Sequence, residues 1–147
     1  MIASARIALA AALVVLAGAA PALAQEAGNE EAAVRAALEH YLLGHATGDG
    51  AHHEMLFHPE AKLFWMRDGA LNTRTSAAYI AGASGQPADD EDQRRREIRM
   101  VDVTGDAAVA KIVLDYPNAL ITDYMSLLKI DGEWKIVNKI FTVQSKS

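Results

Sequence analysis

The chain has five histidines, and all of them fall within 19 residues: His40, His45, His52, His53 and His58. Such clustering raises the question of a metal site, but the spacing argues against one. His52 and His53 are adjacent and point in different directions on a helix, while His40 and His45 are five residues apart, where four would align them. No HExxH pattern or paired-carboxylate motif accompanies them. We therefore predict no bound metal and no cofactor.

His45 is the histidine whose position best suits chemistry. One helical face carries, at spacings of 4, 3 and 4 residues, Val34, Leu38, Tyr41 and His45. At the end of that face, His45 can act as an acid, a base or a hydrogen-bond donor at the mouth of a cavity. The alternatives are a helix-end histidine satisfied by a backbone carbonyl, and a core Tyr41 with a satisfied hydroxyl.

Two C-terminal segments joined by the turn signal Asp131-Gly132 supply further candidates. With a two-residue turn, residue 124 lies opposite residue 139 and residue 126 opposite residue 137. One face of this hairpin then presents Tyr124, Ser126, Lys139 and Phe141. A bulge at the turn would reverse the assignment, because a shift of one residue moves every side chain to the other face.

A buried Lys139 would need a compensating negative charge. That charge is either an anionic ligand or the carboxylate of Asp123 in a second subunit. Five aromatic residues can line a flat, mostly apolar pocket or belong to the core: Phe64, Trp65, Tyr79, Tyr124 and Phe141. We therefore expect a small-molecule ligand and the following ligand-binding residues: Tyr41, His45, Trp65, Tyr124, Ser126, Lys139 and Phe141.

The composition narrows the classes of partner. The chain has 147 residues, 51% hydrophobic and 22% charged, with no cysteine and a formal net charge of −5. The absence of cysteine excludes a disulfide scaffold, a thiol nucleophile and a cysteine-ligated metal. The first 24 residues hold 20 apolar residues and one charge, so the other 123 are about 45% hydrophobic with a balance of −6. Such a domain is a poor candidate for binding nucleic acid or an anionic membrane by charge.

The first 24 residues have the pattern of a secretory signal peptide. Arg6 precedes the apolar run Ile7–Ala17, and Ala22-Leu23-Ala24 forms an A-x-A cleavage site before Gln25. We therefore predict a signal peptide over residues 1–24 and a single exported domain over residues 25–147, periplasmic or secreted, with no membrane contact after cleavage. The alternative is an N-terminal membrane anchor, for which the run is shorter than the ~20 residues needed.

Helical spacing and capping residues predict three helices. The first covers Glu30–Thr47. Asp49 can cap a short second helix, which must stop before Pro59. Thr75 can cap a third helix over Ser76–Ala81. Residues 83–92, which are polar and end in four consecutive acids, are predicted to form a loop.

Strand-forming residues predict a hairpin followed by a four-stranded antiparallel meander. The hairpin joins Ala61–Met66 to a partner near residues 70–73 through Asp68-Gly69. The meander consists of Arg95–Val103, Ala107–Tyr116, Ala119–Ile130 and Glu133–Val143. Both faces of its last strand are partly apolar, whereas helices can cover only one side of a sheet in a domain this small. We therefore expect a homodimer formed through the outer sheet face.

The order of these elements resembles that of the nuclear transport factor 2-like superfamily. Within it, the chain is similar to the putative lumazine-binding family in two segments, Gly105–Lys111 (GDAAVAK) and Asp123–Lys139 (DYMSLLKIDGEWKIVNK). Gly48-Asp49 and Phe57–Ala61 (FHPEA) add to the likeness. The resemblance implies an α+β cone, with three helices packed on a strongly curved, mainly antiparallel sheet, and a pocket inside it. It does not imply a particular ligand, because fold does not determine function.

Ketosteroid isomerases of this superfamily offer a sharper comparison. In them a tyrosine eight residues before the aspartate of a Gly-Asp pair helps to hold an enolate oxygen, and Tyr41 stands eight residues before Asp49. Their catalytic base aligns with Trp65 and their protonated aspartate with Ser126. A tryptophan cannot remove a proton, and a serine is a weaker donor than a protonated carboxyl group. The isomerase mechanism therefore does not carry over to this chain.

These observations predict an exported dimer that binds a small, planar or apolar molecule and has no evident catalytic constellation. One alternative is an enzyme of the isomerase, hydrolase or cyclase type, with His45 or Asp123 as base and Tyr41 as donor. The other is a protein-interaction module that uses the outer sheet face, in which case side chains would fill a narrow cone.

Overall fold

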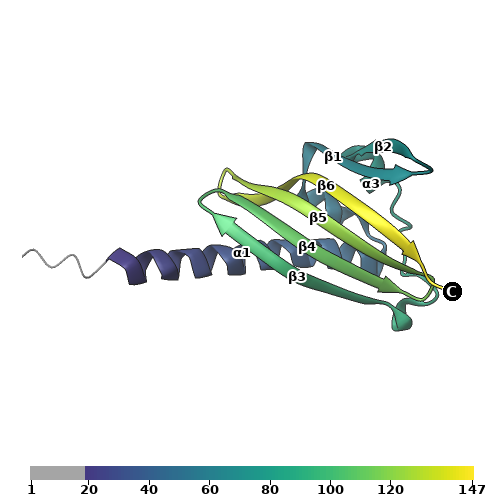
Figure 1. The fold of residues 1–147 in the computed structure, drawn as a ribbon, viewed down its shortest axis with the longest axis horizontal. Helices are drawn as coiled ribbons and strands as arrows, with labels where there is room; N and C mark the ends of the chain where they lie inside the picture. Colours follow the sequence, from purple (N-terminus) through teal and green to yellow (C-terminus); the bar gives the residue numbers. More distant parts are fainter. Residues whose placement is uncertain (1–18) are drawn as a thin grey trace, which may run out of the picture.

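A computed structural model describes residues 19–147, and Figure 1 shows a curved sheet with helices behind it. The helices are α1 (Ala19–Thr47), α2 (Gly50–Leu56) and α3 (Ser76–Ala81), with a single 3₁₀ turn at Glu91–Gln93. Most of the predicted signal peptide, residues 1–18, lies outside the described residues. No helix in the described range is long and apolar enough to cross a membrane. The predicted α+β cone is confirmed.

The sheet has six strands in the order β2-β1-β6-β5-β4-β3. Their bounds are β1 (Phe57–Arg67), β2 (Ala70–Thr75), β3 (Arg95–Thr104), β4 (Ala107–Tyr116), β5 (Ala119–Ile130) and β6 (Glu133–Ser145). The last four strands form the predicted antiparallel meander. The first two form the predicted hairpin, which joins the meander because β1 runs parallel to β6. This one parallel pair closes the sheet around the helices.

Local chemistry places the ends of these elements. Asp49 caps α2 by accepting a hydrogen bond from the amide of Ala51 at 2.9 Å. The turns Asp68-Gly69 and Asp131-Gly132 both have positive φ angles at both residues, as tight hairpin turns between twisted strands require. These signals are short-range, and for that reason they can be recognised in the sequence.

Tertiary contacts hold α1 against the sheet. The Glu30 carboxylate accepts hydrogen bonds from Lys129 Nζ at 2.6 Å and from Trp134 Nε1 at 3.1 Å. Further along the helix, Val34, Leu38 and Tyr41 are fully buried. They pack on the inward-facing residues of the sheet, which include Ile112, Leu114, Met125, Leu127 and Ile136. The face of α1 predicted from helical spacing is thus the face that covers the sheet.

A bulge in β6 corrects the predicted register of the last hairpin. Leu127 pairs with Ile136, but Ser126 pairs with Asn138, so Val137 is an extra residue in β6. Beyond this bulge, Tyr124 lies opposite Ile140, and Met125 lies opposite Lys139. The prediction that Tyr124 and Ser126 share the cone-facing side with Lys139 and Phe141 is therefore wrong. The physical reason is that the bulge turns Lys139 to the same side as Trp134 and Ile136, which regular alternation would forbid.

Candidate functional site

A buried ion pair lies at the centre of the cone. Lys139 Nζ is 3.1 Å from Asp123 Oδ1 and donates a hydrogen bond to the Tyr41 hydroxyl at 2.7 Å. The Tyr41 hydroxyl in turn donates to Asp123 Oδ2 at 2.6 Å. Asp123 and Tyr41 are completely buried, and Lys139 is 4% exposed. The three groups therefore satisfy one another within a single chain, and Asp123 of a second subunit is not the partner of Lys139.

Aromatic rings enclose the remaining sides of the Lys139 ammonium. Its nitrogen lies 4.7 Å from the centroid of Phe141 and 5.1 Å from the centroids of Tyr41 and Tyr79. Burial lowers the pKa of Lys139, and the Asp123 carboxylate opposes that effect. Burial also raises the pKa of Tyr41 well above its usual range, and the charge of Asp123 adds to the rise. Tyr41 therefore remains a neutral phenol.

His45 occupies the end of the same helical face, between two tyrosine hydroxyls. Its Nε2 is 2.9 Å from the Tyr79 hydroxyl, and its Nδ1 is 3.2 Å from the Tyr116 hydroxyl. Its carbonyl oxygen accepts a hydrogen bond from Arg96 at 3.1 Å, and Arg96 in turn binds Glu91. Burial and then the charge of Lys139 hold the pKa of His45 well below its usual range. His45 is therefore neutral, donating from one ring nitrogen and accepting at the other.

A second histidine, His53, packs directly beside His45. The two ring centroids are 5.2 Å apart, and His53 is also 5.1 Å from the ring of Tyr79. His53 Nδ1 is buried and has no hydrogen-bond partner among the described residues. The ring fits because residue 44 is glycine: a Cβ there would lie 2.5 Å from His53 Cε1. Gly44 is thus a site residue that sequence reasoning missed.

These side chains border a cavity of about 240 Å³ at the wide end of the cone. The ends of α1 and α3, helix α2 and the loop after α3 surround it, and exposed residues at 82, 84 and 86 leave it open to solvent. Its polar and aromatic wall includes Gly44, His45, His53, Arg74, Tyr79 and Arg94. The arrangement suits a small molecule that contacts aromatic rings and a few fixed polar groups.

The structure divides the predicted ligand-binding residues into four groups. His45 lines the cavity, while Tyr41 and Lys139 lie beneath it in the buried ion-pair cluster. Trp65 and Phe141 stack on each other with ring centroids 5.2 Å apart, beside the cluster. Tyr124 and Ser126 are on the opposite face of the sheet, where Tyr124 is 44% exposed under Lys111. The last two are therefore not cavity residues.

The histidine cluster separates into unrelated parts. His40 and His52 place their Nδ1 atoms 3.2 Å apart and bond to each other. His58 Nδ1 accepts a hydrogen bond from the amide of Glu60. In the described part of the chain, no three or more His, Cys, Asp or Glu side chains are grouped so as to hold a metal ion.

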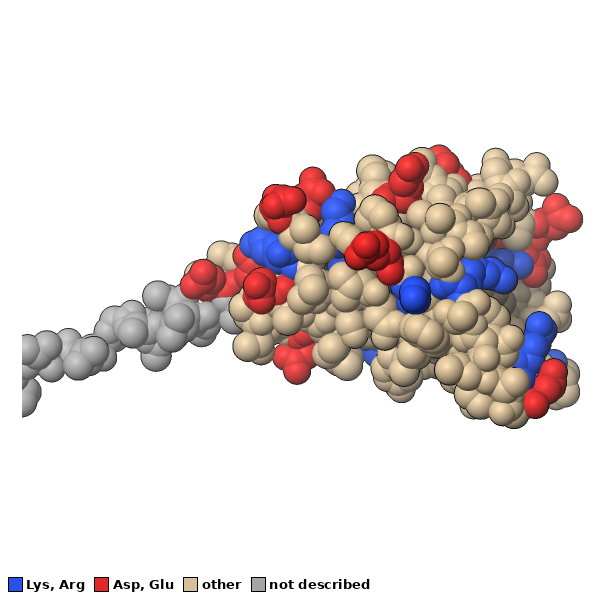
Figure 2. All heavy atoms as spheres, turned by 90° about the horizontal axis from the view of Figure 1, so that it is seen from above, with Lys and Arg blue, Asp and Glu red and all other residues tan. Residues whose placement is uncertain are grey.

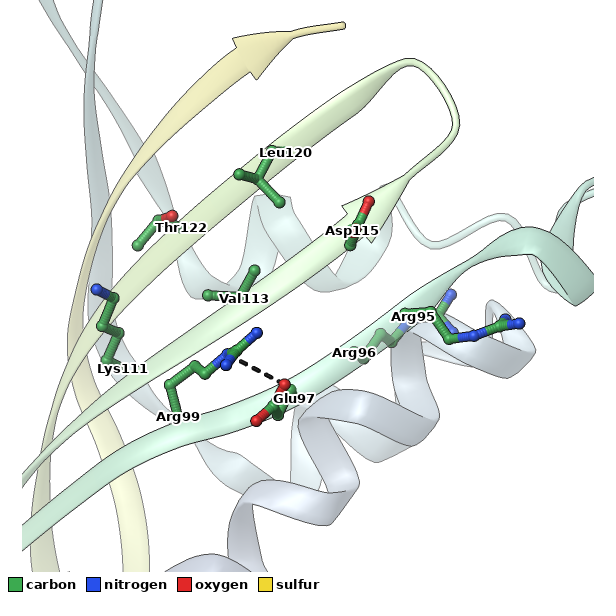
Figure 3. A pocket seen from close by; sticks show the side chains of 9 residues that line it. All are labelled: Arg95, Arg96, Glu97, Arg99, Lys111, Val113, Asp115, Leu120 and Thr122. Atoms are coloured by element: carbon green, nitrogen blue, oxygen red, sulfur yellow. Dashed lines mark ion pairs between the residues drawn. The ribbon is translucent and has the colours of Figure 1, made fainter.

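A larger hollow of about 570 Å³ lies on the outer face of the sheet, where Figure 3 shows side chains from β3, β4 and β5. It is lined by charges of both signs, and Arg99 pairs with Glu97 at 3.0 Å within it. Figure 2 likewise shows acidic and basic side chains interspersed on the face of the molecule that it presents. Arg96 and Asp115 pair with Glu91 and Lys146, which lie outside this hollow. The hollow is an open groove on the sheet surface, so we assign the site to the smaller cavity, which His45 and the buried His53 border.

Three cavity residues are absent from the predicted ligand-binding set: Tyr79, which was only one of several possible pocket aromatics, and Arg74 and Arg94. They come from α3, from β2 and from the loop before β3, and no spacing in the sequence relates them to His45. Aromatic residues on a short amphipathic helix are ordinarily core residues, so the sequence does not specifically indicate that Tyr79 lines a cavity. Arg94 belongs to a run of three arginines that follows four acids, which local charge pairing explains equally well.

Comparisons with known proteins agree with this architecture. A model of the putative lumazine-binding family matches residues 29–142. Among solved structures, the chain resembles a nuclear transport factor 2-like protein of unknown function from Silicibacter pomeroyi DSS-3, with 26% identity, coverage of 80% of this chain and 98% of that one, and a TM-score of 0.70. A nuclear transport factor 2-like protein of unknown function from Methylobacillus flagellatus KT is 27% identical, with coverage of 79% of this chain and 93% of that one, and a TM-score of 0.67.

A third solved structure, from Shewanella baltica OS155, shares the fold at 24% identity, with coverage of 81% and 97% and a TM-score of 0.73. It too is described as a nuclear transport factor 2-like protein of unknown function. No curated protein matches the chain.

Removing one member of the buried ion pair should strongly destabilise the fold. Lys139→Met leaves the Asp123 carboxylate buried without its cation, and we expect a loss of about 3–5 kcal/mol in the free energy of unfolding, measured by urea denaturation. Lys62→Met, at an exposed position on β1, should change it by less than about 0.5 kcal/mol. Combining Lys139→Met with Asp123→Asn should cost less than the sum of the two single changes, because no charge is then left unpaired. Additive effects would contradict the pairing.

The stability of the fold should fall as the pH is lowered toward 4. Burial, followed by the charges of Lys139 and His52, lowers the pKa of His53 from 6.5 to about 4. In this interval the unfolded chain binds a proton that the folded chain does not, so the contribution of His53 is complete above about pH 6.5 and is lost as the pH falls through 4.

The effect of His53 can be isolated by substitution. Chemical denaturation at a series of pH values should show a smaller decline between pH 6.5 and 4 for His53→Leu than for the unsubstituted protein. The other groups packed around this ring are buried or aromatic, namely Tyr41, His45, Phe57 and Tyr79. His58→Leu, at a histidine outside the cavity, is the control. If the free energy of unfolding falls equally with pH in His53→Leu and His58→Leu, the pH dependence does not come from His53.

Proposed function

The chain belongs to the putative lumazine-binding family and has the nuclear transport factor 2-like fold, and on that premise we propose that it binds a small molecule in the cavity beside His45 and His53. The observation that carries the proposal is an open cavity whose polar side chains are fixed by hydrogen bonds to residues within and behind the cavity wall. His45 is fixed between Tyr79 and Tyr116, and the buried cluster of Tyr41, Asp123 and Lys139 supports the floor. Fixed polar groups of this kind orient a ligand without reorganisation.

The dimensions of the cavity limit the ligand. A volume of about 240 Å³ is below the roughly 300–1,000 Å³ of sites that take drug-sized molecules. The ligand is therefore compact, on the scale of one aromatic ring with its substituents. Since the first 24 residues have the signal-peptide pattern, we propose that binding takes place outside the cytoplasm.

Acid–base catalysis centred on Asp123 and Tyr41 is not favoured by this geometry. Both side chains are completely buried, and their polar atoms bond to each other and to Lys139. A general base must reach the proton that it removes, within hydrogen-bond distance or through one water. Binding accounts for the arrangement without moving these groups.

Protein-detected NMR of fragment binding tests the proposal. We expect compact aromatic fragments to shift the amide resonances of Gly44, His45 and Tyr79 in a ¹H–¹⁵N NMR spectrum. Ala83→Phe, which places a ring on the cavity wall, should weaken that binding at least tenfold, because an overfilled cavity leaves no room for a ligand. The matched control is Ala70→Phe at the turn of the β1–β2 hairpin, where the added ring is exposed and does not line the cavity. Shifts confined to the groove of Figure 3 would contradict the proposal.

The outer face of the sheet supports a second part of the proposal, the homodimer. Adjacent positions on β4, β5 and β6 leave large apolar side chains exposed by 41–50%: Val109, Tyr124, Leu128 and Ile140. The helices cover the other face, so these residues form an apolar surface without a partner in the single chain. We propose that this face meets the same face of a second copy in an isologous contact.

Light scattering at micromolar concentration should give twice the mass of one chain. Ile140→Asp places a charge in the proposed interface and should yield a single-chain mass, because an unpaired carboxylate is costly to bury. Leu43→Asp is the control, since Leu43 is 42% exposed on α1, the helix that covers the other face of the sheet. A single-chain mass for the unsubstituted protein would rule out the dimer.

A further inference from the structure

The wall of the cavity is positively charged, although the protein as a whole is acidic. Among the described residues that line it, two are arginines, Arg74 and Arg94, and none is Asp or Glu. The whole chain, by contrast, has 19 acidic and 14 basic residues. A cationic patch in a net acidic protein indicates a site for an anion.

Ion pairing within the chain leaves one of the nearby cations uncompensated. Arg94 binds Asp90 at 2.7 Å, and Arg96 binds Glu91 at 2.5 Å. Lys139 is neutralised by Asp123 in the buried cluster. Arg74 takes part in no ion pair of residues 19–147. The cavity therefore has an excess of one positive charge, carried by Arg74.

The position of Arg74 suits recognition of a ligand at the cavity mouth. Arg74 on β2 pairs with Leu63 on β1, and its guanidinium carbon lies 5.7 Å from the centroid of the Trp65 ring. Trp65 in turn stacks on Phe141, so the aromatic pair supports the guanidinium. Burial lowers the pKa of Lys139, and Arg74 is close enough for its charge to add to that effect. An anion bound there would relieve the repulsion between the two cations.

Three aromatic rings form part of the remaining wall, and Gly44, Gly48 and residues of the loop after α3 form the rest. The ring of Tyr79 lies 5.1 Å from that of His53, and His53 lies 5.2 Å from His45, so three rings border a cavity of about 240 Å³. A planar guanidinium matches a carboxylate in a two-point contact, and one unpaired arginine balances one negative charge. We propose that the ligand is a compact aromatic monocarboxylate, with its carboxylate at Arg74 and its ring among Tyr79, His45 and His53. This assignment rests on the proposed function.

Benzoate and its uncharged analogue benzamide test the assignment by titration calorimetry. We expect the unsubstituted protein to bind benzoate at least tenfold more tightly than benzamide. Arg74→Gln should weaken benzoate about ten- to hundredfold and leave benzamide unchanged, because a charge-assisted bond is lost. Arg74→Lys should retain part of the preference, since it keeps the charge but not the planar fork. Arg99→Gln makes the same change in net charge on the outer sheet face and should preserve the preference.

Each other outcome overturns the assignment. Equal binding of the two probes would show that charge is not recognised, and equal losses in Arg74→Gln and Arg99→Gln would show only a general electrostatic effect. Tighter binding of phenyl phosphate than of benzoate would assign a dianion instead. If uncharged fragments shift the amides of Gly44 and His45 while benzoate does not bind, the carboxylate assignment fails and the binding function stands. If no fragment enters the cavity, both fail.

Discussion

The burial of Lys139 is the constraint on which the rest of this structure depends. An ammonium group with 4% of its surface exposed is tolerable only if a negative charge and hydrogen-bond acceptors surround it. Asp123 on β5 and Tyr41 on α1 meet this requirement, so one helix and two strands must lie in fixed positions around a single nitrogen atom. The aromatic rings that cover its other sides then form the base of the cavity.

The same cluster sets the electrostatics of the cavity above it. Because Asp123 is bonded to Lys139 and Tyr41, its charge is not available to compensate other cations. Burial, followed by the charge of Lys139, lowers the pKa of both His45 and His53 and so keeps the two rings neutral. The site thus combines uncharged aromatic donors and acceptors with one unpaired guanidinium. In a protein whose net charge is −5, that contrast is a local property created by pairing within the fold.

Membership of the putative lumazine-binding family explains the architecture of the chain. The chemistry of the site depends on individual side chains, because a fold does not determine a function. The residues aligned with the base and with the second oxyanion donor of ketosteroid isomerases are Trp65 and Ser126. Trp65 stacks with Phe141 beside Arg74, and Ser126 lies on the outer face. In place of a proton-transfer pair, the cone holds a satisfied ion pair beneath an open cavity. The side chains that carry proton transfer in those isomerases are therefore not assembled in this cone.

The sequence by itself determined most of the secondary structure, because capping side chains, tight turns and side-chain periodicity act over a few residues. Asp49 and Thr75 cap the helices as predicted, and the bounds of β4 and β5 agree with the prediction. The helical face of Val34, Leu38 and Tyr41 was also recognisable, since its spacing is a local property.

Only the tertiary structure decided which side chains meet in the site. The bulge at Val137 turns Lys139 toward Asp123 and places Tyr124 outside the cone, and it is selected by packing of Trp134 and Ile136 together with burial of the ion pair. Arg74, Tyr79 and His45 converge because β1 pairs with β6 in parallel, which brings the β1–β2 hairpin and α3 to the end of α1. Contacts between residues so far apart in the chain depend on the closure of the whole sheet, and no local pattern records them.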